Sequence, residues 1–337
     1  MRYNKGLTIV TFLVVCFVGL SILLKHFKVG SYRSQMNGIR VGWQIPWATE
    51  GQLVQAMKHK NLLQKQNLNP NFIGFSSGAP LNEAALSGKV DVILTADQPA
   101  ATLLNKNSDW VIIGRLMYNR VSLYVPPDSP IKSGADLRGK TVAMPFGAAA
   151  QRLAYKVEQN AGLDPSKDVK NINIDIYEQS SLITDKNATK WGNIDAVAGF
   201  DPTPAVLEEK GLIRNIAVGK VVSVVMMSKS YIIKNPNAPT EFLRALNNSY
   251  VYYKANVGQV DQWFRDESKL NVSSKALEIS ASIEPNMTQP NINLSLNDDD
   301  YQVLQQAADF IYSVKLINKD VTMKDFVNLS SLKNVNN

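Results

Sequence analysis

The sequence has very little cysteine and histidine, and both shortages exclude whole classes of site. Among 337 residues there is one cysteine, Cys16, and there are two histidines, His26 and His59. A lone cysteine inside an apolar N-terminal run leaves the rest of the chain without a disulfide, a thiolate metal centre or a cysteine nucleophile. Two histidines, one of them between Lys58 and Lys60, cannot build a multi-histidine metal site. We therefore expect neither a metal nor another cofactor.

A strong charge imbalance is also missing from most of the chain. The formal net charge is +7, but the first 34 residues contain five basic residues and no acidic one. The remaining residues are therefore nearly balanced, whereas a nucleic-acid-binding domain needs basic charge clustered on its folded surface. This balance excludes nucleic acid as a partner. With 45% hydrophobic and 19% charged residues, the chain is long and apolar enough to bury a large core.

The longest run without charge lies near the N-terminus. Residues 7–24 contain no charged side chain, and Arg2 and Lys5 precede them. This pattern is typical of a secretory signal, and its length also reaches the roughly 17–25 residues that a membrane anchor needs. We expect residues 1–36 to form a signal peptide or an anchor with a linker. The folded body should then lie outside the cytoplasm, in the periplasm or on the outer face of the membrane.

The rest of the chain alternates between strand and helix patterns. Short runs rich in β-branched residues predict strands at 39–43, 71–75, 91–95, 111–115, 121–125, 140–144, 172–177, 195–199 and 221–227. Helical spacing separates most of these runs, and a wholly helical tail follows the last one. This order predicts an α/β fold with mostly parallel sheets and helices on both faces.

Two changes of pattern divide the predicted fold into two lobes. A proline cluster occupies residues 126–130, and the strand at 221–227 leads into the helical tail. Two strands that cross between the lobes, near Val121 and Val224, would return the tail to the first lobe. We therefore expect residues 37–122 and 226–337 to form lobe 1 and residues 123–225 to form lobe 2.

Four short blocks, in a fixed order, carry a resemblance to a known family. They are residues 78–92 (GAPLNEAALSGKVDV), 136–143 (DLRGKTVA) with Gly147, 191–196 (WGNIDA), and Asp201-Pro202. This order resembles that of the solute-binding proteins of bacterial ABC transporters in the nitrate, sulfonate and taurine group. The resemblance implies a type II periplasmic-binding-protein fold, with two lobes joined by two crossing hinge strands. It also implies capture of a small solute in the cleft and its delivery to the permease and ATPase subunits of an import system. We expect a monomer that closes around the solute.

Candidate ligand-binding residues lie where the predicted strands end, because ligands of doubly wound sheets bind there. They are Trp43, Gln44, Trp47, Ser76, Ser77, Gly78, Asp97 and Gln98 in the first lobe, and Phe146, Gly147, Ala148 and Asp201 in the second. Several of them have a purely structural alternative. The tryptophans could pack in a core, the serines and Asp97 could cap helices, and Asp201 could stabilise a turn.

The charges at these strand ends favour a ligand with a cationic part. Asp97 and Asp201 are acidic, and the nearest basic residue in the same turns is Arg152. A site for nitrate or sulfate would avoid facing carboxylates, because an unpaired buried charge is costly. We therefore expect a taurine-like, sulfonate-like or amine-bearing solute whose apolar part lies near Trp43 and Trp47.

Two other functions use the same features. Gly74-Phe75-Ser76-Ser77-Gly78 matches the G-x-S-x-G elbow of serine hydrolases, with Ser76 as nucleophile, but no histidine follows it, as that enzyme class requires. A membrane-tethered ligand sensor would use the same fold and the same anchor. We expect a binding protein without catalytic residues, and the sensor remains the alternative.

Overall fold

The computed structural model describes residues 36–335, which belong to one compact unit that starts at Met36. The predicted signal or anchor at 7–24 lies outside these described residues. Within residues 36–335, none of the helices has both the length and the apolar character that crossing a membrane requires.

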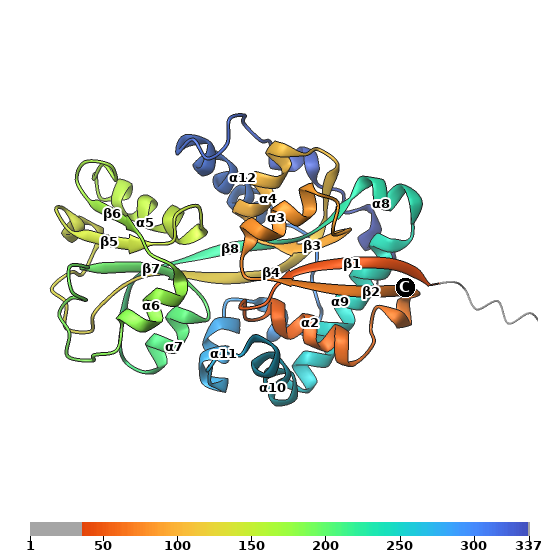
Figure 1. The fold of residues 1–337 in the computed structure, drawn as a ribbon, viewed down its shortest axis with the longest axis horizontal. Coiled ribbons are helices and arrows are strands. Elements are labelled where there is room, and N and C mark those ends of the chain that lie inside the picture. Colours follow the sequence, from red (N-terminus) through yellow and green to blue (C-terminus); the bar gives the residue numbers. More distant parts are fainter. Residues whose placement is uncertain (1–35, 336–337) are drawn as a thin grey trace, which may run out of the picture. The chain divides into compact units, whose positions relative to one another are not determined.

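An eight-stranded sheet runs through the described chain, with the strand order β2-β1-β3-β8-β4-β7-β5-β6 (Figure 1). Its strands are β1 (Asn37–Gln44), β2 (Leu68–Phe75), β3 (Val92–Thr95), β4 (Trp110–Val125), β5 (Thr141–Met144), β6 (Lys170–Asn173), β7 (Ala196–Phe200) and β8 (Arg214–Ser228). Strand β1 pairs in parallel with β2 and β3, and β5 pairs in parallel with β6 and β7. The sheet therefore contains two parallel groups of strands.

Two long antiparallel strands, β4 and β8, join these groups. They contain 16 and 15 residues and pair with each other from Trp110–Ser228 to Val125–Arg214. One end of this pair borders β3 and the other end borders β7, both antiparallel. We call the part built on β1, β2 and β3 the first half and the part built on β5, β6 and β7 the second half. The predicted fold class is confirmed, and β4 and β8 join the strands of both halves into one sheet.

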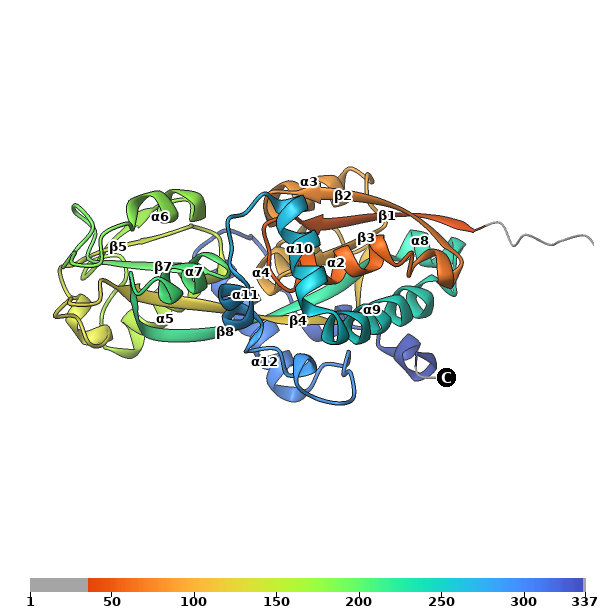
Figure 2. The ribbon, with the colours of Figure 1, turned by 90° about the horizontal axis from the view of Figure 1, so that it is seen from below.

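Helices cover both faces of the sheet in each half (Figures 1 and 2). Those of the first half and the tail are α2 (Glu50–His59), α3 (Gly78–Leu86), α4 (Asp97–Lys106), α8 (Lys229–Lys234), α9 (Ala238–Ala255), α10 (Val257–Ser268), α11 (Ser274–Ala281) and α12 (Asp298–Ser313). Those of the second half are α5 (Ala149–Asn160), α6 (Ile176–Leu182) and α7 (Thr203–Glu209). Short 3₁₀ helices lie at Gln64–Gln66, Gly134–Leu137, Pro285–Met287, Met323–Phe326 and Ser330–Asn334.

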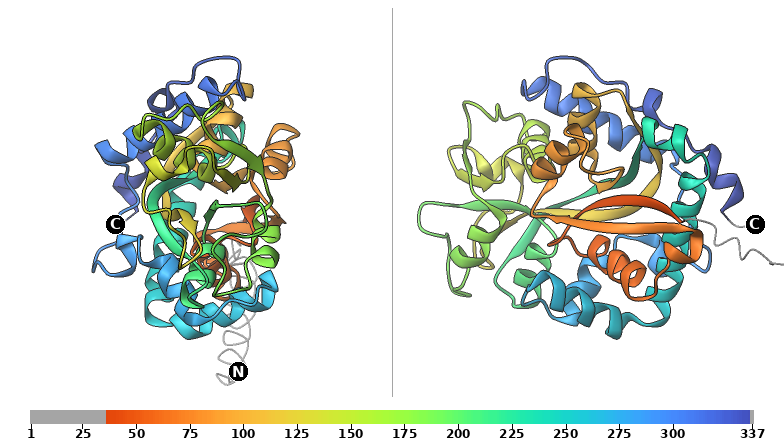
Figure 3. Two further views of the ribbon diagram at one scale, coloured as in Figure 1. Left: turned by 90° about the vertical axis from the view of Figure 1, so that its left-hand side faces the viewer. Right: turned by 45° about the vertical axis from the view of Figure 1, so that its right-hand side comes forward.

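The helical tail returns to the first half. Helices α9 and α10 pack against α2, and α12 packs against α4 (Figure 3). Helix α11 reaches the second half, where it packs against α7. The exact division into lobes at 122/123 and 225/226 stays a prediction, because the described residues belong to one compact unit.

Two local predictions differ from the structure. The expected strand at 172–177 ends at Asn173, because Asp175 begins helix α6 by accepting a hydrogen bond from the Tyr177 N–H. The expected strands at 111–115 and 121–125 form the single strand β4. Polar residues between them interrupt the apolar pattern in the sequence, but they are buried in the fold.

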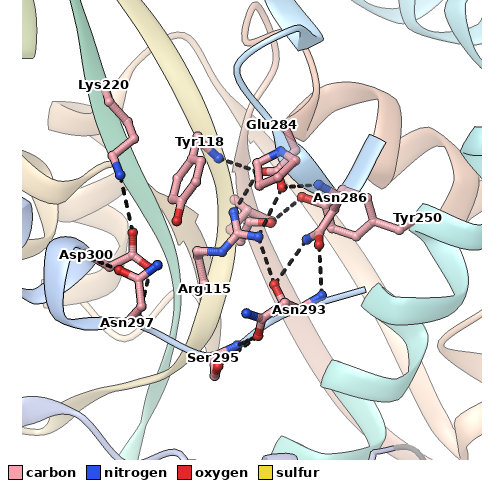
Figure 4. A network of polar contacts seen from close by, with 12 residues as sticks. Arg115, Tyr118, Lys220, Tyr250, Glu284, Asn286, Asn293, Ser295, Asn297 and Asp300 are labelled. Atoms are coloured by element: carbon pink, nitrogen blue, oxygen red, sulfur yellow. Dashed lines mark hydrogen bonds and ion pairs between the residues drawn. The ribbon is translucent and has the colours of Figure 1, made fainter. Parts of the chain in front are cut away.

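A buried polar network attaches the tail to β4 (Figure 4). The guanidinium of Arg115 binds the carboxylate of Glu284 through two contacts, of 2.6 and 3.0 Å, and both side chains are at most 2% exposed. Glu284 also accepts a hydrogen bond from the Tyr118 N–H at 2.6 Å. The Tyr118 ring lies 4.3 Å from the Arg115 guanidinium and 4.3 Å from the Lys220 ammonium of β8. Lys220 also forms an ion pair with Asp299 of α12, so both connecting strands are held to the tail.

Candidate functional site

The two halves contact each other where their strands end. Asp97, the first residue of α4, accepts a hydrogen bond of 2.6 Å at Oδ2 from Nη2 of Arg152 in the first turn of α5. Beside it, Nε2 of Gln98 donates to the carbonyl of Gly147 at 2.9 Å. These two contacts join the segment after β3 in the first half to the segment after β5 in the second.

An aromatic contact joins a second pair of strand ends. The rings of Trp47, which follows β1, and Phe200, the last residue of β7, lie edge to face with their centroids 6.3 Å apart. The carboxyl ends of β1, β3, β5 and β7 therefore meet at one place, which we call the junction. In open α/β sheets this edge is where ligands bind.

Among the described residues, the junction contains several buried polar atoms without a hydrogen-bond partner. Buried side-chain atoms normally have a hydrogen-bond partner. Within residues 36–335, five buried atoms on the segments that meet here have none: Gln44 Nε2, Trp47 Nε1, Glu50 Oε2, Gln98 Oε1 and Arg152 Nη1. Three of these atoms are nitrogen donors and two are oxygens, so the junction has unused capacity to bind a polar solute.

Glu50 is the unexpected member of this set, because the sequence pattern did not mark it. It is the first residue of α2, its side chain is fully buried, and its Oε1 accepts the Gln44 N–H at 2.6 Å. Burial raises the pKa of the Glu50 carboxyl well above its usual value, and the Gln44 N–H only partly opposes this effect. Burial therefore favours the neutral, protonated form of this carboxyl.

The structure brings some of the sequence-predicted residues together and not others. Those in contacts across the junction, or with unpaired buried atoms there, are Gln44, Trp47, Asp97, Gln98 and Gly147. Phe146 is 48% exposed, and Ala148 precedes α5 as its N-cap residue. Both flank Gly147, whose φ of 78° suits glycine.

The remaining residues of the first half stay predictions as ligand contacts. Trp43 is 1% exposed and belongs to the main hydrophobic core. Ser76 and Ser77 are exposed before α3. Gly78 packs so closely on Pro99 that a Cβ atom would lie 2.5 Å from the proline ring, so the position requires glycine.

The two acidic residues do not support a cationic ligand, and this corrects the sequence argument. Asp201 is fully buried and binds the Arg120 guanidinium at 2.8 and 3.2 Å. Asp97 is equally buried and binds Arg152. Both carboxylates are thus neutralised by arginines of the protein itself. The sequence could not show this, because Arg120 is 81 residues from Asp201 and Arg152 is 55 residues from Asp97.

The hydrolase motif is not completed by a base. The ring of His59, at the end of α2, stacks on Trp263 of α10 with centroids 4.1 Å apart. In the described part of the chain, Ser76 is exposed and no hydrogen bond joins it to His59. The G-x-S-x-G match is therefore part of an ordinary strand-to-helix turn.

Comparison with solved structures identifies the fold. The periplasmic aliphatic sulphonate binding protein SsuA from Escherichia coli is similar, with a TM-score of 0.74, 21% identity, and coverage of 87% of this chain and 92% of SsuA. The alkanesulfonate-binding SsuA from Xanthomonas axonopodis pv. citri, solved bound to MOPS, gives a TM-score of 0.66, 21% identity and coverage of 86% and 98%. The described chain thus has the periplasmic-binding-protein fold.

The family follows from the sequence comparisons. The NMT1/THI5-like family model matches residues 55–257, and the chain belongs to this family. A relative from Escherichia coli (strain K12), named for binding aliphatic sulfonates, is 23% identical over 303 residues, which cover 86% of this chain and 88% of the relative. The predicted resemblance to the sulfonate group is confirmed.

The same fold also carries an enzyme. The desulfurization enzyme DszB, solved as a mutant in complex with biphenyl-2-sulfinic acid, gives a TM-score of 0.66 with 13% identity, covering 89% of this chain and 99% of DszB. The fold alone therefore does not separate binding from catalysis.

Proposed function

We propose that this protein captures a small sulfonate-bearing solute at the junction and presents it to the permease and ATPase subunits of an ABC import system. The observation that carries this proposal is the set of buried, unpaired polar atoms at the carboxyl ends of β1, β3 and β5. The names of the relatives supply the ligand class. An exported body, outside the cytoplasm, belongs to the same proposal.

The polarity of the junction favours an anionic oxygen group over an amine. The Nη1 atom of Arg152 lacks a partner in the described structure, while the Nη2 atom of the same guanidinium is fixed by Asp97. Arginine offers planar, always-charged donors that match the oxygens of an oxyanion. The two carboxylates that would attract an ammonium group are already paired with arginines. We therefore place the sulfonate near Arg152 and no cation beside Asp97 or Asp201.

Binding would act by closing the two halves. A ligand that contacts both halves stabilises the closed arrangement only by its greater affinity for that arrangement. The contacts Asp97–Arg152, Gln98–Gly147 and Trp47–Phe200 belong to the closed arrangement. The free protein would exchange between this arrangement and an open one by bending in β4 and β8, and the ligand would favour the closed one. Small-angle scattering should show compaction when butane-1-sulfonate is added. An unchanged radius of gyration with a bound ligand would contradict closure.

Titration calorimetry and thermal shift test the ligand class directly. We expect ethanesulfonate and butane-1-sulfonate to bind, with about 2.7 kcal/mol of added stability at a hundredfold excess over Kd. Butylamine and nitrate are the matched controls, and neither should bind comparably. Butylamine shares only the alkyl chain with butane-1-sulfonate, and nitrate shares only the negative charge. If butylamine binds and butane-1-sulfonate does not, the proposed ligand class is wrong.

We also propose that the protein catalyses no reaction on its solute. The sole cysteine, Cys16, lies in the apolar N-terminal run, and Ser76 lacks a histidine partner in the described structure, where His59 stacks on Trp263. Incubation with a serine-reactive fluorophosphonate should leave Ser76 unlabelled. Labelling of Ser76, absent in Ser76→Ala, would contradict a pure binding role.

A further inference from the structure

Glu50 is a fully buried acid with one oxygen that the protein does not use. Its Oε1 accepts the Gln44 N–H at 2.6 Å, which fixes the carboxyl against the end of β1. Its Oε2 has no hydrogen-bond partner in residues 36–335, and no ion pair of this part of the chain includes Glu50. The carboxyl thus has a fixed orientation and one free oxygen.

The protonation of Glu50 decides what this free oxygen can offer. A carboxyl buried without a cation keeps its proton more strongly than one in water, and burial accordingly raises the pKa of Glu50. Because Oε1 accepts the Gln44 N–H, the proton belongs on Oε2. In this form Oε2 is a hydrogen-bond donor, and a buried donor without an acceptor is unfavourable.

Two further unpaired donors lie close to Glu50 in the chain. They are Nε2 of Gln44 and Nε1 of Trp47, and both side chains are less than 10% exposed. Trp47 touches Phe200 of the second half, which places this loop at the junction. With Glu50 protonated, three donors within seven residues lack an acceptor. Such a set suits a group with several acceptor oxygens.

We propose that Glu50 is a specificity-determining residue whose Oε2 donates a hydrogen bond to an oxygen of the solute, alongside Gln44 and Trp47. This rests on the proposed solute-binding function and deepens it. A sulfonate, with three acceptor oxygens and no proton to give, satisfies all three donors. An ammonium group only donates, so it would leave the indole and the amide of this set unpaired.

Other titratable groups that pack against α2 have partners other than Glu50. Tyr253 of α9 and Asp261 of α10 both bind the side chain of Gln52. Farther along α2, the Lys58 ammonium pairs with the carboxylate of Glu267 in α10 at 2.8 Å. His59 stacks on Trp263. The ionisation of Glu50 itself is therefore the change that should alter the charge of the donor set.

Calorimetric titration with butane-1-sulfonate tests this role in the wild type, Glu50→Gln and Glu50→Leu. Glu50→Gln keeps an acceptor for the Gln44 N–H and replaces the hydroxyl donor by an amide donor, so it should bind comparably. Glu50→Leu removes both the acceptor for the Gln44 N–H and the donor to the solute, so it should weaken binding roughly tenfold to a hundredfold. Asp261→Asn is the matched control, because it alters another buried acid near α2 and should leave the affinity unchanged.

Measuring the affinity for butane-1-sulfonate over a range of pH distinguishes hydrogen-bond donation by Glu50 from a role in packing alone. Wild-type affinity should fall as rising pH ionises Glu50, because the carboxylate cannot donate and repels the sulfonate. Glu50→Gln should lack this fall, and Asp261→Asn should retain it. The comparison of the wild type with Glu50→Gln tests hydrogen-bond donation by Glu50 even if Glu50→Leu does not fold.

The outcomes distinguish this inference from the proposed function. If Glu50→Leu binds as well as the wild type, or Glu50→Gln shows the same pH dependence as the wild type, the role of Glu50 is overturned while solute binding stands. If the wild type binds no sulfonate at any pH, both proposals fail.

Discussion

Asp97 and Arg152 form an ion pair of 2.6 Å that joins the start of α4 in the first half to the first turn of α5 in the second. The carboxylate is fully buried and the guanidinium side chain is 12% exposed, so water screens the pair only weakly. Asp97 Oδ1 also accepts the Gln98 N–H at 2.8 Å. One aspartate therefore both begins a helix and holds an arginine of the other half.

A double-mutant cycle should measure this pair. In urea denaturation of Asp97→Ala, Arg152→Ala and the double variant, we expect a coupling free energy of about 1–3 kcal/mol. The control cycle uses Lys275 and Glu278, an exposed pair on one helix, for which about 0.2–0.5 kcal/mol is expected. Equal couplings in the two cycles would show that the junction pair is no stronger than a surface pair.

Replacing Trp47 by phenylalanine should weaken solute binding with little loss of stability. The variant keeps an aromatic ring against Phe200 and removes the unpaired Nε1 donor. We expect the affinity for butane-1-sulfonate to fall about twofold to tenfold in calorimetry. Trp191→Phe is the control, because its Nε1 is also buried and unpaired in the described chain, but its ring packs on Tyr124. A similar loss in both variants would assign no special role to Trp47.

Removing Arg120 should destabilise the protein strongly. Its guanidinium is the ionic partner of the fully buried Asp201 and also binds Glu208 at 2.8 Å. Arg120→Met would leave a buried carboxylate without its cation, which costs about 3–5 kcal/mol in the free energy of unfolding. Arg138→Met, which breaks a pair whose arginine is 61% exposed, should change stability by less than about 0.5 kcal/mol. A small effect of Arg120→Met in urea denaturation would contradict the assigned pairing.

Glu158 of α5 should make stability fall as the pH rises. Burial raises the pKa of this carboxyl to about 7, and a hydrogen bond from Asn171 only partly opposes the shift. The folded state thus holds the proton more tightly than the unfolded state, in which the pKa is near the ordinary glutamate value of 4.5. The stabilisation is complete below about pH 4.5 and is lost as the pH rises to about 7.

Urea denaturation at several pH values checks this prediction with Glu158→Gln. The stability of the variant should lack this component of the pH dependence. Above pH 7 its free energy of unfolding should exceed that of the wild type by up to about 3 kcal/mol. Glu278→Gln, at a side chain that is 70% exposed, is the control and should follow the wild type. If wild type and Glu158→Gln respond identically to pH, Glu158 titrates as an ordinary surface acid.

Much of the fold could be read from local patterns. The apolar runs near residues 39–43, 91–95 and 140–144 became β1, β3 and β5, and the tail became helices α9 to α12. Strand β4 was predicted in two pieces, because its buried arginines look like surface residues until Glu284 and Asp201 are placed beside them. Such partners lie far away in the chain, where periodicity carries no information.

The sequence by itself determined the α/β class, the crossing strands and the segments that form the junction, because strand ends and glycine turns can be recognised from residues close together in the chain. Only the tertiary structure decided which side chains at the junction are free. It paired Asp97 and Asp201 with arginines and left atoms of Gln44, Trp47, Glu50 and Arg152 without partners among the described residues. Hydrogen bonding and burial depend on groups brought together from distant parts of the chain, so the charge that the site presents to a solute arises only on folding.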